Sequence, residues 1–195
     1  MENYEKETIA AIATALSDSG IGIVRISGEN AIYIVDSIFR SASGKKILTK
    51  VQSHMIHYGY IVDKDENIID EVMTSVMKAP KSYTMEDTVE INCHGGVLVM
   101  QKVLETVLQA GARLAEPGEF TKRAFLNGRI DLSRAEAVID VIHSQNEYAL
   151  SSSVSQLKGR LSDKIRSLRE DILYQIAFIE SALDDPEHIL SLIHI

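Results

Sequence analysis

The feature that most constrains this chain is an apolar stripe along its last third. Ten apolar residues follow one another at steps of three or four, which places them on one side of an α-helix. They are Leu150, Val154, Leu157, Leu161, Ile165, Leu168, Ile172, Ile176, Ile179 and Leu183. This spacing predicts one long helix from about residue 146 to 183, on the order of 60 Å at 1.5 Å per residue. Such a helix cannot bury its stripe against itself, so it needs other helices.

Those helices have to come from another subunit or from sequence beyond residue 195. We therefore interpret the chain as a fragment of a longer protein that also self-associates. Its last residues, ILSLIHI, are apolar and carry no helix stop signal. This ending fits either a cut through a longer sequence or an appended tail.

The first 118 residues have a different pattern, in which short apolar runs alternate with turns. Runs rich in Ile and Val predict strands at 8–14, 21–27 and 88–93. Segments 54–62 and 71–79 are further strand candidates, and the polar loop DKDEN between them indicates a hairpin. Helical spacing follows in two places, over residues 31–39 and over 96–112, where Gly111 provides the usual left-handed cap.

The character of the sequence changes at Pro117-Gly118. A short helix, EFTKRAFL, is stopped by Asn127-Gly128, and Ser133 with Glu136 forms a capping-box pattern before the next helix. We therefore predict an α+β fold: a mixed β-sheet with helices over residues 1–118, followed by an all-α segment of a helical domain over 119–195.

Composition excludes several classes of protein. The chain has 20 basic and 28 acidic residues, a net charge of −8, which lacks the basic excess of an independent nucleic-acid binder. A single cysteine cannot form an intramolecular disulfide. The N-terminus carries acids where a signal peptide is basic, and no run of about 18 apolar residues predicts a membrane span. We expect a cytosolic (cytoplasmic) location and no membrane partner.

The only cysteine lies in the stretch VEINCHGG, beside a histidine and two glycines. Strand alternation places Cys93 on the same face as Val89 and Ile91, where a free cysteine acts as a small hydrophobe. We interpret Cys93 as a buried structural residue; a thiol nucleophile and a metal ligand are the weaker alternatives. The sequence predicts no catalytic residue and no metal site.

Two charged residues are less ordinary. Glu90 lies on the strand face opposite Cys93, just before the glycine turn, and Arg25 is a lone charge inside the apolar run IGIVRIS. A charge in such a run needs a partner if it is buried. The residues alone leave two interpretations open: an exposed arginine or internal ion pair with an acid such as Glu90, or a ligand-binding pair.

Charged residues also gather around the PGEF turn. They are Glu119, Lys122, Arg123, Arg129 and Asp131, and most of them are typical of a solvated helix face. Arg129 differs, because it follows the Asn127-Gly128 break, where a side chain can project from irregular backbone.

Nucleotide-binding motifs are missing from the sequence. SASGKKIL has a Gly-Lys step, but it lacks the upstream glycine of a phosphate loop and the Ser or Thr after Lys45. There is no dinucleotide-binding fingerprint either. We therefore expect that this chain alone neither binds nor hydrolyses a nucleotide by these routes.

Three long segments together resemble the MnmE (TrmE) family of tRNA modification GTPases. They are TIAAIATALSDSGIGIVRISG, YTMEDTVEINCHGG and EPGEFTKRAFLNGRIDLSRAEAVIDVI. The resemblance covers residues 8 to about 187, in the family's order and with matching intervals. It implies the family's N-terminal domain and the first part of its helical domain, truncated before the GTPase domain.

The resemblance also implies a function. In this family the N-terminal domain dimerises, is similar to the folate-binding domain of aminomethyltransferases, and holds a formyl- or methylene-tetrahydrofolate. The family's folate contacts fall on Arg25, Glu90 and Arg129. With the flavoprotein MnmG, the full-length family adds an aminomethyl-type group to carbon 5 of wobble uridine in tRNA. It uses GTP, Mg²⁺ and K⁺, which belong to the GTPase domain.

The residue chemistry is compatible with these implied roles. A carboxylate such as Glu90 accepts paired N–H donors of a pterin ring. The guanidinium groups of Arg25 and Arg129 suit acceptors such as the folate's carboxylates and its one-carbon carbonyl. Two alternatives remain: a dimerisation scaffold with a vestigial folate pocket, and an independent aminomethyltransferase-like enzyme.

Overall fold

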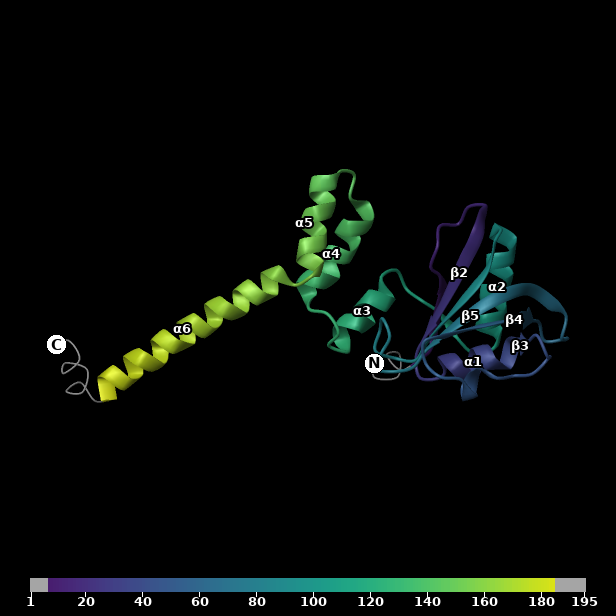
Figure 1. The fold of residues 1–195 in the computed structure, drawn as a ribbon, viewed down its shortest axis with the longest axis horizontal. Helices are drawn as coiled ribbons and strands as arrows, with labels where there is room; N and C mark the ends of the chain where they lie inside the picture. Colours follow the sequence, from purple (N-terminus) through teal and green to yellow (C-terminus); the bar gives the residue numbers. More distant parts are fainter. Residues whose placement is uncertain (1–6, 185–195) are drawn as a thin grey trace. The chain divides into compact units, whose positions relative to one another are not determined.

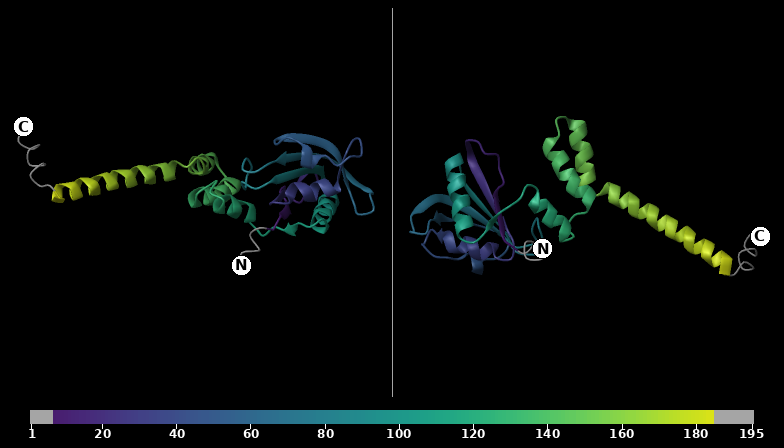
Figure 2. Two further views of the ribbon diagram at one scale, coloured as in Figure 1. Left: turned by 90° about the horizontal axis from the view of Figure 1, so that it is seen from below. Right: turned by 180° about the vertical axis from the view of Figure 1, so that it is seen from behind.

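The computed structural model describes residues 7–184. The acidic N-terminus (1–6) and the apolar ending ILSLIHI lie outside the described residues. The chain divides into two compact units, one reaching Arg129 and the other starting at Ile130. Each unit is described by itself below, with Figures 1 and 2 showing the course of the chain.

A seven-stranded sheet forms the body of the first unit, in the order β3-β4-β5-β6-β2-β1-β7. Neighbouring strands are antiparallel except for β1 and β7, which are parallel. The sheet is thus mixed, and the predicted α+β class with a following all-α segment is confirmed. The strands are β1 (Ile9–Ile12), β2 (Ser19–Ser27), β3 (Phe39–Ser41), β4 (Met55–Val62), β5 (Ile68–Met77), β6 (Thr88–Gly95) and β7 (Arg113–Leu114).

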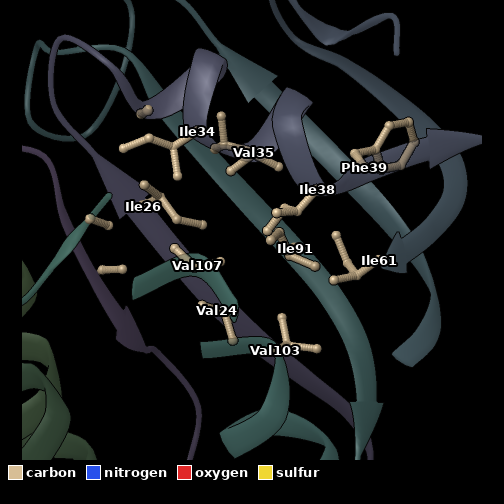
Figure 3. Packing of buried hydrophobic residues seen from close by; sticks show 14 of the residues in the cluster. Val24, Ile26, Ile34, Val35, Ile38, Phe39, Ile61, Ile91, Val103 and Val107 are labelled. Atoms are coloured by element: carbon tan, nitrogen blue, oxygen red, sulfur yellow. The ribbon is translucent and has the colours of Figure 1, made fainter. Parts of the chain in front are cut away.

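One face of this sheet carries the helices α1 (Ala31–Ile38) and α2 (Val97–Gln109), and a 3₁₀ turn, η2 (Leu48–Lys50), lies near α1. Figure 3 shows the core between them, where aliphatic side chains of both helices meet those of the strands. Val24, Ile26 and Ile91 of the sheet are fully buried there. We call the opposite side of the sheet, which carries neither α1 nor α2, the second face.

Strand β6 follows the alternation that its sequence predicts. Val89, Ile91 and Cys93 are buried in the core, whereas the Glu90 and Asn92 side chains point to the second face and are partly exposed. The structural interpretation of Cys93 as a buried residue is therefore confirmed.

The predicted hairpin and helix stop also form. Strands β4 and β5 pair in antiparallel fashion across the DKDEN loop. Helix α2 ends at Gln109, and Gly111 follows with φ of 116°, the left-handed region that glycine tolerates best.

Helix α3 (Glu119–Leu126) belongs to the first unit, so the structural division falls after Arg129 and not at 118. Two contacts tie it to the segment before β6: the Tyr83 and Thr121 hydroxyls lie 2.9 Å apart, and Asn127 Nδ2 donates to the Thr84 carbonyl at 2.6 Å. The Pro117-Gly118 turn marks a change of secondary structure but not the end of the packed unit.

The second unit consists of helices α4 (Leu132–His143), α5 (Glu147–Leu157) and α6 (Arg160–Asp184). Figures 1 and 2 show α4 and α5 side by side. Asp131, and not Ser133, caps α4, because the Asp131 carboxylate accepts a hydrogen bond from the Arg134 amide. The predicted capping box is therefore wrong by two residues: Ser133 already lies inside the helix.

The predicted single helix over 146–183 is also wrong. It is interrupted at Gly159, whose φ of 86° lies in the left-handed region and ends α5. Beyond the break, α6 has no buried residue, and its large apolar side chains remain 45% to 75% exposed. Within residues 7–184 no helix combines the length and the apolar character that crossing a membrane requires.

Candidate functional site

Arg25 and Glu90 form a cross-strand pair on the second face of the sheet. Strand β2 pairs with β6 so that these two residues lie opposite each other. Arg25 Nε donates to Glu90 Oε1 at 2.7 Å, and the two side chains are 30% and 22% exposed. Arg25, the single charge within the apolar run IGIVRIS, is therefore paired with Glu90, as a partly buried charge requires.

Small residues flank this pair in the sheet. Ala11 of β1 lies next to Arg25, and Ser75 of β5 lies next to Glu90. Neither side chain is long enough to cover its charged neighbour. The ion pair therefore remains accessible from the second face, although it lies in the middle of the sheet.

Aromatic rings frame the pair on the side of α3. The guanidinium carbon of Arg25 lies 5.7 Å from the ring centre of Tyr83 and 5.7 Å from that of Phe120. The guanidinium carbon of Arg129 lies 4.8 Å from the Tyr83 ring. Both arginines are within the range of cation–π attraction. The structure therefore brings Arg25, Glu90 and Arg129 together around Tyr83.

The hydrogen bonding of Glu90 leaves one carboxylate oxygen available. Arg25 occupies Oε1, and no residue in the described part of the chain donates a hydrogen bond to Oε2. A partly buried carboxylate with an unused oxygen accepts N–H donors of a ligand. Together with two guanidinium groups, it can recognise a molecule that has donors at one end and acceptors at another.

A buried network of ion pairs joins helix α3 to the rest of the first unit. Arg123 is 5% exposed and donates to Glu86 at 3.2 Å, to Glu119 at 3.1 Å and to the Glu7 carbonyl at 2.8 Å. The expectation of a solvated face is therefore wrong for Glu119 and Arg123, which are buried. It holds for Lys122, which is exposed. Arg129, which was set apart from that face because it follows the Asn127-Gly128 break, is exposed as well.

The electrostatics of Glu119 follow from its partners. Burial alone would raise its pKa, but hydrogen bonds from Arg113, from the Glu116 amide and from Arg123 outweigh burial and lower the pKa to about 2. The Arg113 guanidinium lies 2.6 Å from Glu119 Oε1. Glu119 is therefore ionised at neutral pH and fixes the first turn of α3.

Cys93 lacks the features of a nucleophile. Burial, and secondarily the charge of Asp70, raise the pKa of its thiol to about 11, so it is protonated at neutral pH. Its neighbour His94 is exposed and pairs with Asp70 at 2.7 Å, which raises the pKa of the imidazole. Within residues 7–184, no group of three or more His, Cys, Asp and Glu side chains gathers as a metal site would require.

A hollow of about 230 Å³ lies elsewhere on the second face, next to His94. Tyr58, Met73 and Asn92 are among its lining residues. None of the three predicted site residues lines it. The Arg25–Glu90 site is therefore separate from this hollow.

Comparison with known proteins agrees with this division into a sheet domain and a helical segment. Residues 8–129 match the family model described as the GTP-binding protein TrmE N-terminus, and residues 132–194 match the MnmE helical domain. These matches, which agree with the observed fold, define a class: the N-terminal and helical parts of a GTP-binding protein.

Curated relatives narrow the class. The chain is 64% identical over 183 residues to the tRNA modification GTPase MnmE of Lachnoclostridium phytofermentans, and 56% identical over 185 residues to that of Geobacillus kaustophilus. Each match covers 94% of this chain and 40% of the relative. The Bacillus subtilis protein is 52% identical over 183 residues. The chain therefore belongs to the tRNA modification GTPase MnmE family and spans about 40% of the length of these relatives.

Proposed function

We propose that the first unit binds a formyl- or methylene-tetrahydrofolate at Arg25, Glu90 and Arg129. The observation that carries this proposal is the convergence of these three residues, from β2, β6 and the end of α3, around the Tyr83 ring. Two cations and one carboxylate, all partly accessible, match a ligand with both donors and carboxylates.

Each group has a distinct role in this proposal. A pterin presents an amine and a ring N–H side by side, and Glu90 accepts them with its free Oε2 and with Oε1, which it shares with Arg25. Arg25 and Arg129 bind the acceptors of the folate, namely the one-carbon carbonyl and the glutamate tail. No covalent step at a residue of this chain is required.

The function proposed for the whole protein extends beyond this chain. With the flavoprotein MnmG, it adds an aminomethyl-type group to carbon 5 of wobble uridine in tRNA, in the cytoplasm. GTP, Mg²⁺ and K⁺ act in its GTPase domain. The present sequence has no phosphate loop, so we expect it to hydrolyse GTP only at the background rate.

We also propose that the chain forms a homodimer through its first unit. The second face exposes several large apolar side chains: Ile21, Ile56, Tyr58 and Met73 are 48% to 64% exposed. Such a patch is typical of an interaction surface, and a second copy would cover the proposed folate site on the same face. Sedimentation at micromolar concentration is expected to show a species larger than the 21.6 kDa monomer; a monomer alone contradicts the proposal.

One observation favours the alternative of a scaffold with a vestigial pocket. Arg25 Nε and Glu90 Oε1 lie only 2.7 Å apart, so the two residues form an ion pair without a ligand. In that case the pair would stabilise the sheet, and the apolar second face would carry the whole function.

Substitution of Glu90 by Gln separates the two possibilities. Glu90→Gln replaces one anionic acceptor oxygen by an amide donor, so one pterin N–H faces a mismatched group. Losing a charge-assisted hydrogen bond costs about 1.5 to 3 kcal/mol, or about 10- to 150-fold in affinity. Calorimetric titration with 5-formyl-tetrahydrofolate measures this loss, and the melting temperature of the same sample reports folding.

The buried neighbour Cys93 provides the control for this experiment. Cys93→Ser alters the same strand on its core side, so we expect folate affinity within about threefold of the original, with any effect confined to stability. A folded Glu90→Gln protein that binds 5-formyl-tetrahydrofolate as tightly as the original, with a lowered melting temperature, contradicts the ligand role and favours the scaffold.

A further inference from the structure

We infer that Tyr83 is a positioning residue of this site, whose ring holds the guanidinium groups of Arg25 and Arg129 in the orientation that binds ligand. This inference rests on the proposed function. It adds a residue whose role no hydrophobic periodicity indicates, because Tyr83 lies in the irregular segment between β5 and β6.

The ring of Tyr83 contacts two cations that are far apart in the sequence. Arg129 lies 4.8 Å from its centre and Arg25 lies 5.7 Å away. No other ring among residues 7–184 lies within cation–π distance of Arg129. Arg25 is also held by Glu90 and Phe120, so Arg129 depends more on Tyr83.

Side-chain contacts hold Tyr83 and the residues after it from two sides. On the side of α3, the Tyr83 hydroxyl contacts Thr121 at 2.9 Å. On the side of β2, Ser27 contacts the Thr84 hydroxyl at 2.6 Å and the Glu86 carboxylate at 2.8 Å. Tyr83 is therefore held before any ligand binds.

Orientation matters because a free arginine side chain loses rotamer entropy when it is ordered. Arg129 is exposed and follows Gly128, whose φ of 77° places it just beyond the end of α3. The Tyr83 ring restricts Arg129 in advance, and so reduces the entropy that ligand binding would otherwise cost.

Three variants separate the ring from its hydroxyl. Tyr83→Leu removes the ring, and we expect 5-formyl-tetrahydrofolate to bind about 3- to 30-fold more weakly, the range of one partly desolvated cation–π contact. Tyr83→Phe keeps the ring. Thr121→Val is its matched control, because it removes the same hydrogen bond from the other side. Both variants keep the aromatic ring, so they are expected to bind within about threefold of the original chain.

A double-mutant cycle tests whether Tyr83 acts through Arg129. If it does, Tyr83→Leu combined with Arg129→Met weakens binding less than the product of the two single effects. Multiplicative losses overturn the inference. So does a Tyr83→Leu chain that binds as tightly as the original, or a Thr121→Val chain that loses as much affinity as Tyr83→Leu.

Replacing Tyr83 by pentafluorophenylalanine covers the case in which Tyr83→Leu fails to fold. This ring keeps its shape but loses its negative face, so the expected loss of affinity is again about 3- to 30-fold, against Tyr83→Phe as reference. Equal binding by both overturns the inference. If the unaltered chain does not bind 5-formyl-tetrahydrofolate at all, the proposed function itself is wrong. If the unaltered chain binds it and the Tyr83 variants bind it with unchanged affinity, only this inference fails.

Discussion

Ile91 and Ile172 are both isoleucines, but they lie in two regions of the molecule with opposite surroundings. Ile91 of β6 is fully buried between the sheet and its helices, whereas Ile172 of α6 is 59% exposed. Both follow a regular apolar pattern in the sequence. The first unit thus closes its own core, and α6 presents an apolar stripe that nothing else in the described chain covers.

This contrast shows what a periodic pattern establishes and what it does not. Alternation in β6 and the three-to-four spacing in α6 each identify which side of an element is apolar. Neither pattern says what covers that side. In the first unit two helices from the same domain cover the sheet, and the four predictions below use this difference between the units.

The largest expected effect concerns the buried ion network. Arg123→Met leaves the carboxylates of Glu86 and Glu119 without their shared partner, which is expected to cost about 3 to 5 kcal/mol. Its matched control is Arg166→Met on α6, because Arg166 pairs with Asp163 at 3.8 Å and both are about two-thirds exposed. That pair is worth about 0 to 1 kcal/mol. Urea unfolding of both variants checks the difference; equal losses contradict the contrast between the units.

The second prediction compares the two isoleucines directly. Ile91→Ala removes buried methyl groups and leaves a cavity, at a cost of about 2 to 5 kcal/mol. Ile172→Ala changes an exposed position, and we expect a change within about 0.5 kcal/mol. The free energy of unfolding measured at low protein concentration tests the pair. A large loss in Ile172→Ala would show that α6 is already packed.

The third prediction concerns acid stability. The pKa of Glu119 is about 2 in the folded chain and 4.5 as a free side chain. Because the folded pKa is the lower one, the stabilisation is present above pH 4.5 and is lost as the pH falls towards 2. The loss is at most about 3.4 kcal/mol, for about 2.5 pKa units at 1.36 kcal/mol per unit.

Urea unfolding at pH 7, 4 and 3 measures this loss. In Glu119→Gln the free energy of unfolding should depend less steeply on pH. Asp131 of the second unit also has a pKa lowered to about 2, by hydrogen bonds from Ser162, Ser133 and the Arg134 amide. Its side chain is 41% exposed, so Asp131→Asn is expected to flatten the acid loss less. The prediction is contradicted if Asp131→Asn reduces the acid-induced loss of stability more than Glu119→Gln does.

The smallest effect is expected at the break between α5 and α6. Gly159→Ala places a methyl group in the left-handed region, at a cost of about 1 to 2 kcal/mol, and against the Arg134 guanidinium. Ser151→Ala, at an exposed position of α5, is the control and should stay within about 0.5 kcal/mol. The helical circular dichroism signal on heating measures both. A Gly159→Ala chain of higher stability would indicate that α5 and α6 join into one helix.

Much of the fold was predictable because the first unit obeys local rules. The main strands, the hairpin and the cap at Gly111 follow from alternation and turn residues. The break at Gly159 was missed because the apolar stripe continues across it, although the glycine itself was the available signal. The capping residue of α4 was misassigned because Asp131 and Ser133 are both good caps, and only the backbone decides between them.

The candidate site was only partly predictable. Strand alternation places Arg25 and Glu90 on the face opposite the core, and their pairing is confirmed. Tyr83 lies in the irregular segment between β5 and β6, where no periodicity reports which way a side chain points, and Phe120 lies on the short helix α3, whose partner the sequence does not indicate. The burial of Arg123 was missed for a related reason: its partners Glu86 and Glu7 are distant in sequence.

Hydrogen exchange of the backbone amides tests the contrast between the two units most directly. At low protein concentration, the account predicts that amides of β2 and β6 exchange only through global unfolding of the first unit. Amides of α6 should exchange orders of magnitude faster, because helix propensity alone protects them. If the amides of α6 are as well protected as those of β6, the stripe is already covered and the account is contradicted.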